Sequence, residues 1–117
     1  MKLRITAIFF LLTFLDIASP QEKQQGCDIN KEVYKNPSQS AMLVKMEFTD
    51  GCPDADSYVY VFDANNKEVS RHTVPDMQKR VFNLDVPASG AVRFNCRGNG
   101  HNSSGSCSTL LISATPE

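Results

Sequence analysis

Four cysteines are the residues of this chain whose chemistry is easiest to assign. They are Cys27, Cys52, Cys96 and Cys107. No two of them form a Cys-x-x-Cys pair, the spacing common in zinc sites, so we expect no metal centre built on cysteine. Widely spaced cysteines in a short chain are typical of small extracellular domains held together by disulfides. The sequence therefore predicts two disulfides.

Four cysteines can pair in three ways. We favour the local pattern, in which Cys27 joins Cys52 and Cys96 joins Cys107. The second bond would then close the 97–106 loop between neighbouring strands. The alternative is a cross-sheet Cys52–Cys96 bond, which leaves Cys27 to pair with Cys107.

Three aspartates, Asp50, Asp54 and Asp56, lie close together in the chain. Calcium binds several carboxylate and carbonyl oxygens held within a small radius, so these side chains are the candidate ligands of a Ca²⁺ site. Their spacing does not follow the acidic pattern of an EF-hand loop. A solvated acidic loop is the simpler interpretation, and the sequence calls for no other cofactor.

No nucleophile and base stand in a known catalytic pattern. The chain lacks the Gly-x-Ser-x-Gly elbow of serine hydrolases, so we expect no enzymatic activity. Of the two histidines, His72 lies in an expected strand and His101 in a glycine-rich loop, where it is a candidate binding residue. Asn102 begins an Asn-Ser-Ser sequence, which is an acceptor for N-glycosylation in a secreted eukaryotic protein.

Arginine and tyrosine side chains anchor many protein interfaces. Arg93 and Arg97 are the candidate binding residues near the last loop. Arg71, Tyr58 and Tyr60 would join them wherever they are exposed. For any single one of these residues, an ordinary surface or core position is the simpler interpretation.

The N-terminus resembles a signal peptide. Lys2 and Arg4 precede an apolar run over residues 5–15, which is much shorter than the ~20 residues needed to span a bilayer. Cleavage after Ser19 would release the rest of the chain. We therefore expect export and no stable membrane anchor.

The charge balance excludes two classes of partner. The chain has 12 basic and 13 acidic residues, a formal net charge of −1. Proteins that bind nucleic acids or anionic membranes carry a marked excess of positive charge, so we expect neither partner. After cleavage the chain is long enough for one domain.

Apolar and polar residues alternate along most of the chain, as in half-buried strands. The expected strands are 42–48, 58–62, 68–74, 81–86, 91–96 and 107–113. The 58–62 segment is apolar at every position, so we expect it at the centre of a sheet. Residues 20–26 are expected to be loose, and residues 28–34 to form one helical turn or an irregular segment.

Residues 81–96 resemble strands E and F of an immunoglobulin-like domain. An alternating apolar strand leads into a Ser-Gly turn, and Phe94 stands two residues before Cys96, where the family has a tyrosine and a cysteine. The resemblance implies a two-sheet sandwich with 58–69 as its C–C′ hairpin. The chain departs from the family in having no tryptophan, and no cysteine near Met46 or Phe48, where strand B of the family has one.

These observations predict an all-β, immunoglobulin-like antiparallel sandwich of two sheets, with about six to seven strands and two disulfides. Its organisation would be a signal peptide at 1–19, a partly irregular segment at 20–39 tied to the fold through Cys27, and a β-sandwich at 40–117.

The expected function is that of a secreted, extracellular recognition module that binds a protein or glycan through loops at the strand ends or through a sheet face. The candidate loops are 49–57, 63–67 and 97–106. The alternative is a secreted effector, toxin-like factor or protease inhibitor without enzymatic activity.

Overall fold

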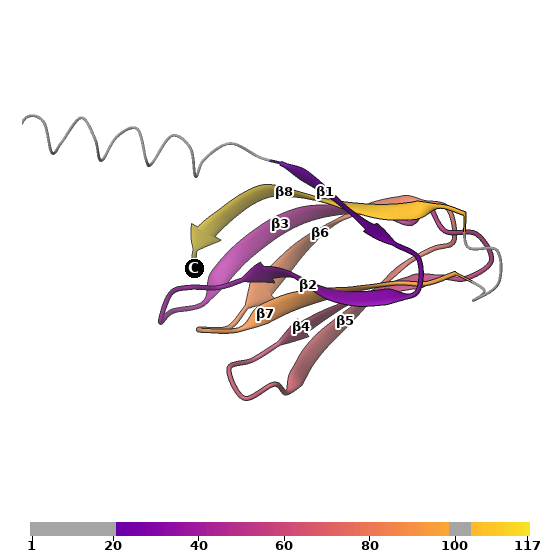
Figure 1. Ribbon diagram of the computed structural model, residues 1–117. Coiled ribbons are helices and arrows are strands. Elements are labelled where there is room, and N and C mark those ends of the chain that lie inside the picture. Colours follow the sequence, from indigo (N-terminus) through magenta and orange to yellow (C-terminus); the bar gives the residue numbers. More distant parts are fainter. Residues whose placement is uncertain (1–20, 99–103) are drawn as a thin grey trace, which may run out of the picture.

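The computed structural model describes residues 21–98 and 104–117, and the regular structure of this part of the chain consists of eight β-strands (Figure 1). The strands are β1 (Glu22–Gly26), β2 (Ile29–Lys35), β3 (Met42–Thr49), β4 (Ser57–Phe62), β5 (Glu68–Val74), β6 (Lys79–Val86), β7 (Ala91–Cys96) and β8 (Ser106–Pro116). Within the described ranges no helix is long and apolar enough to cross a membrane.

The strands pair from the two ends of the chain inward, the first with the last and the two middle strands with each other. β1 pairs with β8, β2 with β7, β3 with β6 and β4 with β5, all antiparallel. Two further pairings, β3 with β8 and β4 with β7, gather the strands into two sheets. Sheet A has the order β1-β8-β3-β6 and sheet B the order β2-β7-β4-β5, and the two face each other (Figure 1). This is the strand order of a jelly roll, a sandwich of eight strands.

The core lies between the two sheets and is formed by the inward positions of the alternating strands. Its fully buried side chains include Val44, Met46, Phe48, Val59, Val61, Leu84, Val86, Val92 and Phe94. The rings of Phe48 in sheet A and Phe94 in sheet B meet edge to face with centroids 5.1 Å apart, a favoured geometry for aromatic pairs. The two sheets are therefore joined by direct side-chain packing.

The expected all-β sandwich of two antiparallel sheets with two disulfides is confirmed, with eight strands rather than six to seven. The two additional strands lie where we expected loose chain over 20–26 and a helical turn or irregular segment over 28–34. Both expectations were wrong. β1 and β2 are edge strands with mostly exposed side chains, so they show no apolar alternation. They are strands because their backbones pair with β8 and β7.

The strand order differs from that of an immunoglobulin domain. In that family the last strand neighbours strand F in the same sheet. Here β8 crosses to the other sheet and lies between β1 and β3, while β2 takes the place beside β7. The similarity of residues 81–96 to strands E and F is therefore local, and it does not extend to the topology of the whole chain.

The connections between strands gather at two ends of the sandwich. The β1–β2, β3–β4, β5–β6 and β7–β8 connections share one end, which we call the cysteine end. Loop 49–57 and the described ends of the 97–106 loop belong to it, whereas loop 63–67 lies at the opposite end. There Asn66 has a positive φ of 62°, as expected for the tight hairpin between β4 and β5.

Asn36 joins two connections at that opposite end. Its side chain is fully buried, and its Nδ2 donates hydrogen bonds to the carbonyl oxygens of Ser40, Val86 and Pro87 at 3.0, 3.2 and 2.9 Å. Its Oδ1 accepts a hydrogen bond from the backbone N–H of Ser38 at 2.9 Å. One amide group thus ties the β2–β3 connection to the β6–β7 connection.

Candidate functional site

All four cysteines meet at the cysteine end. Cys27 lies between β1 and β2, Cys52 between β3 and β4, and Cys96 and Cys107 on either side of the β7–β8 connection. Cys27 is bonded to Cys52 and Cys96 to Cys107, with S–S distances of 2.03 and 2.08 Å. The favoured pairing is therefore confirmed. Because β7 and β8 belong to different sheets, the second bond joins the two sheets, not neighbouring strands of one sheet as we expected.

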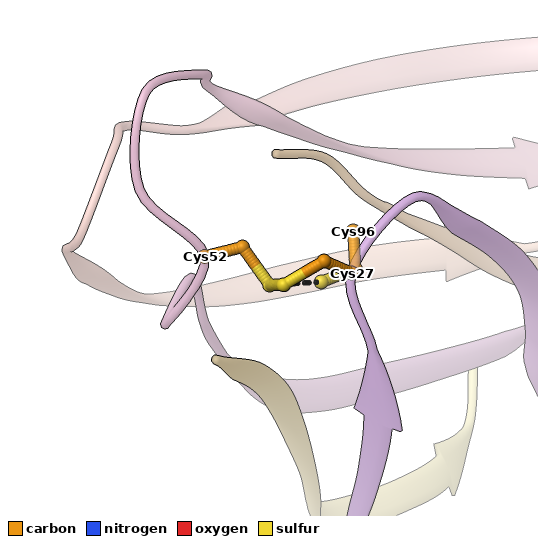
Figure 2. A group of neighbouring side chains, drawn as sticks. All are labelled: Cys27, Cys52 and Cys96. Carbon is orange, nitrogen blue, oxygen red and sulfur yellow. Dashed lines mark hydrogen bonds between the residues drawn. A yellow bond between two sulfur atoms is a disulfide. The ribbon is translucent and has the colours of Figure 1, made fainter. Parts of the chain in front are cut away.

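The two disulfides touch each other. Figure 2 shows the sulfur of Cys96 against the Cys27–Cys52 bond. The Sγ atoms of Cys52 and Cys96 are 3.2 Å apart, and those of Cys52 and Cys107 are 3.8 Å apart. Neither sulfur of these pairs carries a hydrogen, so the contacts are packing contacts between two disulfides. The sulfur atoms of Cys27, Cys52 and Cys96 lie within 4.8 Å of one another, close enough to share a metal ion. All four cysteines are in disulfides, however, and a metal is bound by the thiolate form.

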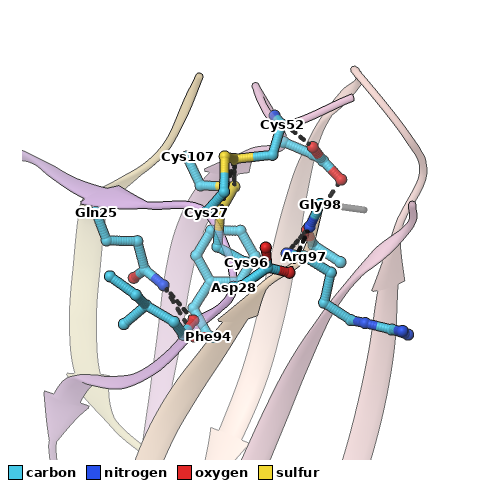
Figure 3. Close-up of a disulfide and its surroundings, with 12 residues drawn as sticks. Gln25, Cys27, Asp28, Cys52, Phe94, Cys96, Arg97, Gly98 and Cys107 are labelled. Carbon is cyan, nitrogen blue, oxygen red and sulfur yellow. Dashed lines mark hydrogen bonds between the residues drawn. A yellow bond between two sulfur atoms is a disulfide. The ribbon is translucent and has the colours of Figure 1, made fainter. Parts of the chain in front are cut away.

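Polar contacts fasten the strands around these disulfides (Figure 3). Gln25 of β1 is buried, and its Nε2 donates to the carbonyl oxygens of Ile29 at 2.8 Å and Phe94 at 3.2 Å, so it reaches from sheet A to sheet B. The backbone N–H of Gly98 donates to Asp28 Oδ1 at 3.0 Å. The cysteine end is therefore held by side-chain hydrogen bonds as well as by disulfides.

Asp50, a candidate calcium ligand, accepts hydrogen bonds within the protein. It is buried, its Oδ1 accepts from the Cys52 N–H and its Oδ2 from the Ser57 hydroxyl, each at 2.9 Å. Ser57 Oγ in turn accepts from the backbone N–H of Arg97 at 3.0 Å. Burial raises the pKa of Asp50 above its ordinary value of 3.8. The three residues form a chain of hydrogen bonds that positions the backbone of Arg97.

Asp54 and Asp56 are exposed and face the β5–β6 connection instead of Asp50. The backbone N–H of Asp54 donates to Asp76 Oδ2 at 3.3 Å, and the N–H of Asp76 donates to Asp56 Oδ1 at 2.9 Å. The structure thus groups Asp54 and Asp56 with Asp76, and separates the third predicted calcium ligand from them. Calcium binding stays a prediction.

The outer face of sheet B carries three aromatic side chains in a row. Tyr58, Tyr60 and Phe62 alternate along β4 with the buried valines and point away from the core. Ring centroids of successive members are 6.3 and 6.2 Å apart. We call these three residues the aromatic ladder. All three are partly exposed, and β4 is an interior strand with β7 and β5 on its two sides.

Three arginines flank the aromatic ladder. The guanidinium carbon of Arg71 lies 5.1 Å from the centre of the Tyr60 ring, and that of Arg97 lies 5.6 Å from the centre of the Tyr58 ring. Both distances are typical of cation–π contacts. Arg93, opposite Tyr60 on β7, donates hydrogen bonds to Asn30 Oδ1 at 3.3 Å and Asn30 O at 3.2 Å.

The ion pairs among the described residues leave part of this positive charge uncompensated. Arg71 pairs with Glu68 at 3.2 Å, an interaction that raises the pKa of Arg71. The other ion pair joins Lys79 and Glu47 on sheet A. Within the described ranges Arg93 and Arg97 therefore pair with no carboxylate.

The structure brings the predicted binding residues Arg93 and Arg97 together with Arg71, Tyr58 and Tyr60 on one face. Sequence reasoning missed Phe62 as a surface residue, because the segment is apolar at every position and was interpreted as buried on both faces. The available signal was the difference between its outward aromatic and inward valine positions. His101 and Asn102 lie outside the described residues.

His72 is a half-buried residue of β5. Its ring centroid lies 4.9 Å from that of Phe82, so the two rings pack together. It lines an open cleft of about 340 Å³ between the β5 and β6 edges, with Val69, Asn83 and Asp85 among the other walls. This cleft is separate from the aromatic ladder, which lies on the outer face of the sheet.

Comparison with known proteins relates the chain to others by fold alone. The sequence matches no known protein-family profile and no curated protein. Its fold is similar to that of a protein from Bacillus endospore appendages, which form a family of disulfide-linked pili. The TM-score is 0.56 with 8% identity, over 84% of this chain and 85% of that one.

A second solved structure, the VP2 subviral particle of infectious bursal disease virus, matches 81% of this chain and 30% of its own length at 9% identity. Its TM-score of 0.36 is too low to establish a common fold. The chain is thus a disulfide-bonded β-sandwich, and its two internal disulfides are compatible with an extracellular protein.

Proposed function

We propose that this chain is a secreted recognition module and that it binds its partner through the outer face of sheet B. The observation that carries the proposal is the aromatic ladder with arginines on both sides of it. Tyrosine and arginine are enriched among the residues that contribute most to binding energy at interfaces. Of the two expected locations, strand-end loops and a sheet face, the proposal therefore favours the sheet face.

The position of the aromatic ladder supports this assignment. An antiparallel sheet with one face on the core usually presents polar side chains to water on the other face. Here the outer face of the central strand β4 carries three aromatic rings, and no other described element lies over it (Figure 1). Apolar patches that remain exposed and are rimmed by polar groups commonly mark interaction sites.

The rigidity of the surface is a second argument. β4 is hydrogen-bonded on both sides, to β5 and to β7, so the spacing of the three rings is fixed by the sheet. A preformed surface loses less conformational entropy when it binds a partner. Secretion, supported by the predicted signal peptide and the oxidised cysteines, would place the surface among extracellular proteins and glycans.

Binding to a panel of immobilised extracellular glycans and secreted proteins tests the proposal. We expect Tyr60→Ala and Arg93→Ala to weaken any specific binding by about tenfold or more, the effect of losing a residue that dominates an interface. Arg80→Ala is the matched control, because Arg80 is an exposed arginine of β6 in sheet A. Equal losses in Arg80→Ala and Arg93→Ala would show that the outer face of sheet B is not the site.

A structural subunit of an extracellular assembly is the second candidate function. The fold similarity to the protein of disulfide-linked pili favours it. All four cysteines of this chain are in internal bonds, so covalent links between copies would first require one of these bonds to open. Light scattering of the purified protein decides: a stable monomer at high concentration argues against self-assembly.

A further inference from the structure

The register of sheet B arranges the outer face as three rows that run across its four strands. Each row holds one residue from β2, β7, β4 and β5, in that order. The rows are Asn30-Asn95-Tyr58-Thr73, Glu32-Arg93-Tyr60-Arg71 and Lys35-Ala91-Phe62-Glu68. Neighbouring strands are about 4.8 Å apart, so Arg93 and Arg71 flank Tyr60 at similar distances on both sides.

Positive charge collects on this face although the chain as a whole is slightly acidic. The rows hold Arg71, Arg93 and Lys35, and Arg97 lies over Tyr58 at the end of the ladder. The acidic residues in the rows are Glu32 and Glu68, of which Glu68 is paired with Arg71. The formal net charge of the whole chain is −1. A local excess of cations in an otherwise acidic protein selects an anionic partner by charge complementarity.

The groups between the charges are suited to hydroxyl-rich ligands. Asn30, Asn95 and Thr73 surround Tyr58 with neutral donors and acceptors of hydrogen bonds. The ladder gives flat apolar surfaces at a regular spacing of 6.3 and 6.2 Å along β4. The hydrogen-bonding groups of the β4 backbone are already used by β5 and β7, so an extended peptide could not add to this strand.

We propose that the outer face of sheet B binds an anionic polysaccharide, a chain of sugars that carry carboxylate or sulfate groups. The sugar chain lies along the aromatic ladder, with its ring faces and hydroxyl groups over Tyr58 and Phe62. Its anionic groups accept hydrogen bonds from the guanidinium groups of Arg71, Arg93 and Arg97, whose planar donors match carboxylate and sulfate oxygens. This inference rests on the proposed function and specifies its partner.

Titration of the secreted protein with defined polymers tests the inference. The probes are polygalacturonate, which is carboxylated, dextran sulfate, and neutral dextran. Poly-glutamate and oligothymidylate represent acidic peptides and single-stranded nucleic acid. We expect binding to polygalacturonate or dextran sulfate at least about tenfold tighter than to the other three, and the preferred polymer identifies the anionic group.

Variants locate the binding. Arg93→Ala and Arg97→Ala are expected to weaken polysaccharide binding about tenfold, and Arg80→Ala to leave it unchanged. Tyr60→Phe, which keeps the ring and the fold, is expected to retain most of the affinity, whereas Tyr60→Ala loses it. Each variant is first shown to have the wild-type melting temperature within a few degrees. Arg97→Lys substitutes for Arg97→Ala if the latter does not fold.

Two results overturn the inference. The first is no preference for either anionic polysaccharide over poly-glutamate or oligothymidylate. The second is an equal loss of binding in Arg80→Ala and Arg93→Ala. If the polysaccharides do not bind but Tyr60→Ala and Arg93→Ala abolish binding to a secreted protein, the inference fails while the recognition function stands. If these variants alter no binding in either experiment, both fail.

Discussion

Removal of the Cys27–Cys52 disulfide is expected to destabilise the fold more than removal of the Cys96–Cys107 disulfide. The first bond closes a sequence separation of 25 residues and the second a separation of 11. A disulfide restricts the unfolded chain more when its loop is longer, which gives about 3.5 kcal/mol for the first bond and about 2.8 kcal/mol for the second. The relevant perturbations are the paired alanine variants Cys27→Ala/Cys52→Ala and Cys96→Ala/Cys107→Ala.

The packing loss acts against this order. Cys52, Cys96 and Cys107 are fully buried, and the sulfur of Cys52 contacts both sulfurs of the other disulfide. Either paired substitution therefore leaves a gap beside the remaining disulfide. The gap is larger for Cys96→Ala/Cys107→Ala, because both of its cysteines are fully buried whereas Cys27 is only partly buried. The difference of about 0.7 kcal/mol from loop length is therefore the largest gap that we expect between the two variants.

Urea unfolding of the oxidised proteins measures the difference in unfolding free energy directly. In thermal unfolding, 1 kcal/mol corresponds to a shift in melting temperature of about 4–8 °C for a domain of this size. We therefore expect the melting temperature to fall by at least about 14 °C for Cys27→Ala/Cys52→Ala and about 11 °C for Cys96→Ala/Cys107→Ala. Wild-type protein unfolded in the presence of a reductant serves as the control without either bond. If the Cys96→Ala/Cys107→Ala variant is the less stable one, loop length does not control the contribution of these disulfides.

Three further predictions concern single polar residues. Burial raises the pKa of Asp50, so the folded state holds this proton more tightly than the unfolded state does. The free energy of unfolding therefore falls as the pH rises from 3.8 toward the raised pKa. Asp50→Asn should flatten this part of the curve when the free energy of unfolding is measured over a series of pH values. Asn36→Asp keeps the shape but sets a carboxylate against three carbonyl oxygens, and should cost at least about 3 kcal/mol in urea unfolding, whereas a loss under 1 kcal/mol would contradict the assigned amide orientation. Because hydrogen bonds occupy both oxygens of Asp50, millimolar calcium should leave the melting temperature unchanged, and a rise would instead support a site at Asp54 and Asp56.

The interior strands could be predicted from the sequence because burial of one face imposes alternation. In β3 the residues Val44, Met46 and Phe48 are buried and the intervening ones are more exposed, as the pattern predicted. β1 and β2 could not be found in this way. Their side chains are largely solvated on both faces, and their extended conformation is set by partners more than 50 residues away in the chain, as Lys31 opposite Phe94 illustrates.

The disulfide pairing could be predicted from the sequence, but the fact that the second bond joins the two sheets could not. Short loops favour pairing between cysteines that are near in the sequence, whatever the topology of the strands, and the local pairing was confirmed. The assumption that Cys96 and Cys107 lie on neighbouring strands failed, because residues 97–106 lead from sheet B to sheet A. A crossing connection and a hairpin of this length have the same glycine-rich and serine-rich composition, so local sequence does not distinguish them.

The proposed binding surface could be recognised only through a distinction that binary patterning overlooks. Along residues 58–62 of β4 every side chain is aromatic or aliphatic, which predicts burial on both faces of a central strand. The two faces nevertheless differ in kind: the inward positions Val59 and Val61 are β-branched aliphatic residues, whereas the outward Tyr58 and Tyr60 carry hydroxyl groups that favour contact with water. An all-apolar strand with tyrosines on one face only is therefore better interpreted as a central strand with an exposed aromatic surface. Arginines at the cross-strand positions, Arg93 and Arg71 beside Tyr60, add the positive charge on which the proposed recognition of an anionic partner rests.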